Sequence, residues 1–117
     1  MASNPGRKLF QWTHHPYTAL AKAMCGELKR RGASSAEIYR TVHELLPDLD
    51  ALCLEKWGAR ATETRLAQRA DQTVRMNEDK NPRVAPWVEM AKALLVTQQP
   101  MSLADVMMRV PAEATAG

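Results

Sequence analysis

Residues 59–76 read ARATETRLAQRADQTVRM, and the rest of the chain can be arranged around this stretch. At about 100° per residue, the apolar side chains fall on one face of a helix, at Ala59, Leu66, Ala70 and Val74. Arginine and glutamine side chains gather on the opposite arc without a carboxylate among them, at Arg65, Gln68, Arg69, Gln72 and Arg75. The pattern predicts a helix that docks on a bundle through a narrow apolar face and turns a basic face outward.

Helix signals recur on both sides of this stretch. Pro16 and Pro86 suit the first turn of a helix. Ser34 and Ser102 each stand three residues before an acidic residue, which is the spacing of a capping box. Gly58 suits a C-terminal cap. Besides 59–76, the expected helices are 16–31, 34–46, 48–58, 86–97 and 102–110.

The composition favours an all-α fold. Of the 117 residues, 45% are hydrophobic but only 5% are aromatic, so the core must be aliphatic, which suits helices better than sheets. The length fits one domain. We therefore expect a single bundle of five or six helices at 16–110, preceded by a flexible basic and aromatic arm at 1–15 and followed by a disordered tail at 111–117.

Two segments of the chain resemble each other. PYTALAKAM (16–24) and PWVEMAKAL (86–94) are alike at seven of nine positions, and each leads into a Ser-capped helix. If this is a duplication, two similar helical hairpins pack around a pseudo-twofold with the central basic helix between them. Chance likeness between two amphipathic hairpins explains the similarity equally well.

Charge is polarised along the chain, although the net charge is only +3. Residues 1–31 carry six Lys and Arg against one acid, and residues 59–83 carry six against four. Outside the central stretch, the candidate nucleic-acid contacts are Lys29, Arg30, Arg31, Arg7 and Lys8. The cations at 29–31 also suit the last turn of a helix, where the dipole favours positive charge. A basic face of this kind predicts a polyanionic partner.

The sequence carries no recognisable reaction chemistry. It has no Gly-rich phosphate loop, nucleophile motif or metal-spaced cluster, so we expect no enzyme, no cofactor and no metal site. Cys25 and Cys53 lie on apolar stripes and are expected to be buried free thiols. No apolar run approaches the roughly 18 residues of a membrane span, and the N-terminus lacks the apolar core of a signal peptide. We therefore expect a cytoplasmic protein without a membrane partner.

Three functions fit these features. The first is binding to the phosphate backbone of RNA or DNA through the basic helix face, without sequence reading. The second is a helix-turn-helix DNA-binding transcription regulator, but its candidate recognition helix begins Pro47-Asp48-Leu49-Asp50, and such an acidic entry is repelled by DNA. The third is a protein-binding adaptor or inhibitor of phage or plasmid type.

The adaptor hypothesis needs an apolar docking surface. Phe10 and Trp12 of the arm are too apolar for a purely solvated tail, and we expect them to contact a protein partner or another copy of the chain. Exposed Met76, Met101 and Met108 would extend this surface, although methionine in a small aliphatic core is the ordinary explanation.

In size, helical pattern and charge the chain resembles the small helical subunit of CRISPR effector complexes. Those subunits are compact helical bundles that line a nucleic-acid strand beside a larger backbone. The resemblance implies a ribonucleoprotein assembly in antiviral defence, with other protein subunits or further copies of the chain as partners. It includes no diagnostic motif, so it assigns no role to any single residue.

Overall fold

A computed structural model describes residues 15–78 and 84–110, with the backbone alone at 56–57 and 75–78, and all regular elements in these ranges are helices. The described part of the chain contains α2 (Pro16–Arg30), α3 (Ser35–Leu45), α4 (Leu49–Trp57), α5 (Glu63–Glu78), α6 (Ala85–Thr97) and α7 (Leu103–Met108). The predicted all-α bundle is confirmed. The basic helix, however, begins at Glu63, so Ala59 precedes it.

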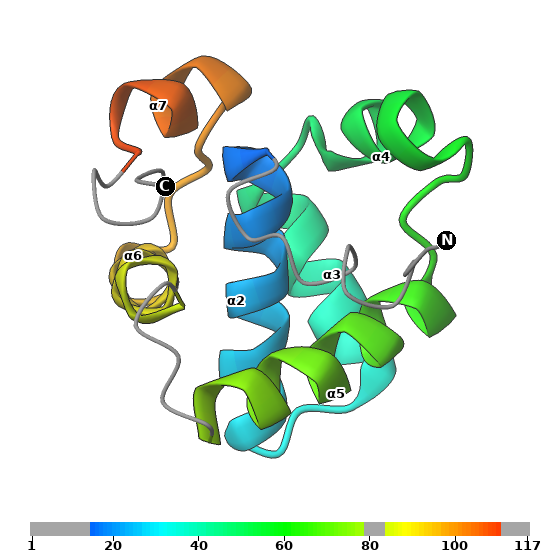
Figure 1. Cartoon of the computed structure of the whole chain (residues 1–117), viewed down its shortest axis with the longest axis vertical. Coiled ribbons are helices and arrows are strands. Elements are labelled where there is room, and N and C mark those ends of the chain that lie inside the picture. The colour runs from blue at the N-terminus through cyan, green and yellow to red at the C-terminus, as the bar shows by residue number, and fades with distance from the viewer. Residues whose placement is uncertain (1–14, 79–83, 111–117) are drawn as a thin grey trace, which may run out of the picture.

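The helix at the centre of the bundle is α2. Its residues from Tyr17 to Glu27 are all buried, and it contacts α3, α4, α5, α6 and α7. Figure 1 shows α6 and α7 on one side of it and α3, α4 and α5 on the other. The basic helix was expected in this central place and instead packs against α2. Small residues on several faces of α2 allow the close approach of its neighbours, at Ala19, Ala21, Ala23 and Gly26.

Helix α5 approaches α2 closely at Gly26. A Cβ atom at this position would lie 2.7 Å from the Cβ of Thr73 and closer still to its methyl group. Thr73 is fully buried, and its hydroxyl donates to the Arg69 carbonyl at 2.9 Å. The missing side chain at Gly26 therefore sets how deeply α5 packs onto α2.

Tyr17 joins two turns that are far apart in the sequence. Its buried hydroxyl donates to the Met101 carbonyl and accepts from the Asp48 amide, both at 3.2 Å. The Met101 amide donates to the Leu45 carbonyl at 2.8 Å, and the Leu103 amide donates to Asp48 Oδ2 at 3.2 Å. Asp48 occupies the N-cap position of α4 but makes no side-chain cap there; its carboxylate accepts from the Leu103 amide instead.

Local capping follows the sequence. The Ser34 hydroxyl accepts from the Glu37 amide at 3.2 Å, and the Glu37 carboxylate accepts from the Ser34 amide at 2.8 Å. Ser102 begins α7 in the same reciprocal way. Gly32 and Gly58 close α2 and α4 with φ of +88° and +69°. Both predicted capping boxes are confirmed. The two helices whose sequences resemble each other, α2 and α6, pack against each other.

Gly26→Ala is expected to lower the free energy of unfolding by about 1–3 kcal/mol through overpacking, measured by urea unfolding. Ala93→Gly on the exposed face of α6 is the matched control. It should also lose stability, by about 1 kcal/mol, from helix propensity alone. A Gly26→Ala variant more stable than the parent would mean that α5 can move away from α2 without cost.

Tyr17→Phe should cost about 1–3 kcal/mol, because it removes the partner of two backbone groups in a buried place. Thermal and urea unfolding measure the loss. Tyr39→Phe, at a half-buried ring against His43, should stay within about 0.5 kcal/mol of the parent. Equal losses of unfolding free energy in the two variants would show that the Tyr17 hydroxyl does not hold the two turns together.

Candidate nucleic-acid interface

The basic face of α5 lies differently from the prediction. Leu66 and Ala70 are buried as expected, but so are Thr73 and Arg69, the latter only 9% exposed. The buried face has rotated toward Arg69 because Gly26 admits Thr73 between the two helices. The expectation that every arginine of this helix points outward is therefore wrong for Arg69.

Other polar residues of α5 remain near the surface: Gln68 is exposed, and Arg65 and Gln72 are half-buried. Val74, predicted on the buried face, is only half-buried. Arg69 Nη1 donates to Gln72 Oε1 at 3.4 Å. The side chain of Arg75 lies outside the described residues.

A small recess lies between α2, α4 and α5. Three cationic side chains line it, Lys22 from α2 and Arg65 and Arg69 from α5, and we name these three the cation cluster. The remaining described lining is two thiols with apolar and hydroxyl side chains: Cys25, Cys53, Thr18, Ala21, Leu49, Ala61 and Leu66. The apolar stems of the three side chains face the recess. Arg69 lies near enough to Lys22 and to Arg65 for the charges to affect one another.

The cluster is held at an electrostatic cost. Burial, and then the neighbouring charge of Arg69, lower the pKa of Lys22 from 10.5 to about 8. Burial and then Arg65 lower the pKa of Arg69. Both effects disfavour the charged forms of these two groups.

The two thiols in the recess are not activated. Burial raises the pKa of Cys25 to about 12 and that of Cys53 to about 11. Both are buried free cysteines, as the sequence predicts. Since a thiol is reactive only as a thiolate, these groups contribute volume rather than chemistry near neutral pH.

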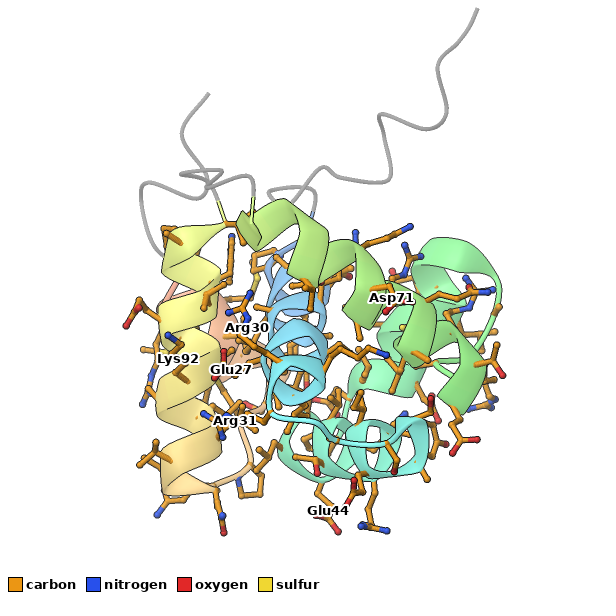
Figure 2. The ribbon with its side chains drawn as sticks, turned by 90° about the horizontal axis from the view of Figure 1, so that it is seen from below. Glu27, Arg30, Arg31, Glu44, Asp71 and Lys92 are labelled. Carbon is orange, nitrogen blue, oxygen red and sulfur yellow. The ribbon has the colours of Figure 1, made fainter. Side chains whose placement is uncertain are left out.

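The three cations at the end of α2 have carboxylate partners. Arg31 Nε donates to Glu27 Oε2 at 3.0 Å, and Arg30 Nη1 lies 3.7 Å from Glu27 Oε1. Lys29 Nζ lies 3.5 Å from Asp71 Oδ1, an exposed pair between α2 and α5. Figure 2 shows Arg30 and Arg31 beside Glu27 and places Asp71 on α5. Of these pairs only Lys29–Asp71 is exposed on both sides, and such pairs are worth about 0–1 kcal/mol. Glu27 is buried, so Arg30 and Arg31 are held more firmly.

The remaining predicted contacts cannot be placed. Arg7, Lys8, Phe10 and Trp12 lie outside the described residues.

Of the three methionines expected to be exposed, Met108 is 85% exposed, whereas Met101 is buried, so that expectation is wrong for Met101. The Met101 backbone bonds to Leu45 and Tyr17 draw its side chain inward. The side chain of Met76 is outside the described residues.

His43 and its neighbours form a structural junction. Its Nε2 lies 3.1 Å from the Ala61 carbonyl and 3.5 Å from Asp50 Oδ1. The same carboxylate accepts from the Ala61 amide at 3.1 Å and pairs with Arg60 at 3.8 Å. These contacts fix the connection between α4 and α5, which brings Ala61 to the recess.

The described residues hold neither a metal-binding group nor a membrane-spanning helix. They contain no group of three or more His, Cys, Asp and Glu side chains placed to hold a metal ion. Across the same part of the chain, none of the helices has both the length and the apolar character needed to cross a membrane.

Sequence reasoning missed Lys22. It stands between Ala21 and Ala23, next to the apolar stripe of α2, and reads as a surface lysine. The available signal was the run of small residues around α2, which indicates a helix packed on all sides. The side chain of a lysine in such a helix must extend to where the neighbouring helices stop covering it. For Lys22 this place is beside the recess.

Lys22→Met should gain stability relative to the parent below pH 8. The folded-state pKa of Lys22 lies below its ordinary value. Between about pH 8, the pKa of Lys22 in the folded protein, and pH 10.5, its ordinary pKa, the unfolded chain holds more protons than the folded protein. The contribution of Lys22 to stability therefore rises with pH in this range. The advantage of the variant should shrink by about 3 kcal/mol from pH 7.5 to 10.5. Urea unfolding of both proteins at each pH measures it, and Lys22→Gln controls for lost hydrogen bonding. A pH-independent difference would contradict the shift.

Comparison with protein-family models, with curated proteins and with solved structures finds no match to this chain. The geometry of its own residues therefore carries the functional assignment. That geometry consists of the cation cluster in its recess, the glutamines beside it on α5, and the paired cations at the end of α2.

Proposed function

We propose that this protein is a non-catalytic nucleic-acid-binding subunit that contacts the phosphate backbone through the joint surface of α2 and α5. The observation that carries the proposal is the convergence of Lys22, Arg65 and Arg69 on one recess. Guanidinium and ammonium groups donate strong, charge-assisted hydrogen bonds to phosphate oxygens.

The surroundings of the cluster suit a strand that passes over it. Gln68 is exposed on the same helix and Gln72 is half-buried, and amide side chains commonly bond to phosphate and sugar oxygens. At the end of α2, Arg30 and Arg31 share the single carboxylate of Glu27, which leaves an excess positive charge there. This surface needs no element that reads sequence.

The helix-turn-helix alternative has less support in the structure. The described exposed side chains of α4 are Ala51, Leu54 and Glu55, which offer no cation to a DNA groove. Asp48 and Asp50 at its start are bonded to Leu103 and Ala61. Backbone-directed binding is therefore the better proposal for this fold.

Assembly with other subunits is part of the proposal. One copy with a net charge of +3 binds weakly, whereas several copies along one strand multiply the effect. Apolar side chains are exposed on α6 and α7, with Val96 at 76% and Met108 at 85%, and they offer a surface for protein contacts. The resemblance to the small subunits of CRISPR effector complexes implies an assembly of this kind, and that implication stays a prediction.

Arg65→Ala tests the proposal. It should weaken binding of single- and double-stranded oligonucleotides about five- to tenfold, irrespective of sequence, and reduce the slope of log K against log salt by about 1. Fluorescence anisotropy at several salt concentrations measures both. Arg40→Ala, an exposed arginine on α3 that lines a different groove, loses the same charge and should bind like the parent. Equal effects of the two substitutions, or no binding by the parent, would refute the proposed surface.

A further inference from the structure

We infer that a groove between α2, α3 and α6 binds a small zwitterion, an aliphatic amino acid or a short peptide of such residues. The carboxylate of the ligand meets Arg31, and its ammonium group meets Glu44. This inference goes beyond the proposed function. Binding in the groove is measured without nucleic acid, so either proposal can fail while the other stands.

The groove has the size of a small-molecule site. Its volume is about 420 Å³, and ligand pockets commonly measure about 300–1,000 Å³. Three leucines supply apolar surface, the half-buried Leu28 and the buried Leu45 and Leu95. The lining that solvent can reach is nevertheless mainly polar, unlike that of the recess between α2, α4 and α5. A ligand that matches this lining has a short aliphatic part and polar ends.

Opposite charges line the groove from two helices without pairing. Arg31 stands at the end of α2 and Glu44 on α3 (Figure 2). In the described part of the chain, no ion pair joins the two side chains, and no hydrogen bond uses the Glu44 carboxylate. A ligand with both charges can bridge them through two charge-assisted hydrogen bonds.

Arg31 is held in place while part of its guanidinium stays available. Its Nε donates to Oε2 of the buried Glu27 at 3.0 Å. Its two terminal Nη groups make no hydrogen bond to the residues that the structure describes. Because Arg30 shares the same carboxylate, two positive charges face one negative charge. The end of α2 therefore keeps an excess positive charge and free donors for a carboxylate.

Gln98 gives an independent argument from the backbone. It caps α6 at φ +57° and ψ +32°, and it is the one residue other than glycine with a positive φ in 15–78 and 84–110. Glycine usually occupies this cap position, and side chains held in such a conformation are common at ligand sites. The Gln98 amide makes no hydrogen bond within the described residues, and it lines the groove with the Thr41 hydroxyl. Both groups are placed to bond to the polar ends of a ligand.

Isothermal titration calorimetry tests the inference with L-leucine and leucyl-leucine as probes. Each is compared with its own N-acetyl derivative, which lacks the ammonium group, and its own amide, which lacks the carboxylate. The tighter zwitterion should bind at least about tenfold more tightly than either derivative, because each derivative loses one charge-assisted hydrogen bond. Tighter leucine assigns a free amino acid, and tighter leucyl-leucine assigns a peptide. No binding, or equal binding of the derivatives, would overturn the site.

Substitutions locate the binding. Glu44→Gln should weaken the tighter zwitterion about tenfold but change its N-acetyl derivative by less than about twofold. Glu55→Gln, at an exposed carboxylate of α4 outside the groove, loses the same charge and should bind like the parent. Gln98→Gly should melt at the same or a higher temperature, because glycine suits the cap, and should bind more weakly. Arg31 is kept, since its loss would deprive buried Glu27 of a partner.

Two results would overturn this assignment of the groove. One is an equal effect of the substitutions at Glu44 and Glu55. The other is a Gln98→Gly protein that binds the zwitterion as tightly as the parent.

Discussion

The structure depends on the burial of α2 from all sides. Eleven consecutive residues of this helix are removed from solvent, so every other helix is placed by how it packs against α2. Apolar burial drives this arrangement at roughly 25 cal/mol per Å², and the small residues of α2 set the distances. Polar side chains on such a helix must find an edge of the packing. Glu27 reaches one where Arg30 and Arg31 meet it, and Lys22 reaches the other beside Arg65 and Arg69.

This constraint links the fold to the proposed function. Gly26 admits Thr73, and the resulting rotation of α5 carries Arg69 from the predicted outer arc to the wall of the recess. Burial, and then the neighbouring cations, lower the pKa of Lys22 and of Arg69, which disfavours their charged forms. Such a cost is common at binding sites, where groups are held for a ligand rather than for the fold. A polyanion is the partner that we propose for this arrangement.

Much of the fold followed from local sequence, and little of the site did. The limits of α3 and α7 are set by Ser34 and Ser102 and those of α2 and α4 by Gly32 and Gly58, and each signal acts within a few residues. The orientation of α5 was missed because it depends on the contact of Thr73 with Gly26, far earlier in the chain, and helical periodicity carries no information about that contact. Lys22 was missed for the same reason: the recess exists only when α2, α4 and α5 are assembled. Asp48 shows the same limit: it stands at the N-cap of α4, but its side chain accepts from the distant Leu103 amide.

The central claim is that the joint surface of α2 and α5 is where the protein meets nucleic acid. A titration of ¹⁵N-labelled protein with a short single strand, followed by two-dimensional NMR at low salt, tests this surface directly. The account predicts that the largest shift changes fall on amides of 63–74 and on those of 18–30, and that they diminish as salt is added. Changes confined to α6 and α7, or no changes at saturating strand, would contradict it.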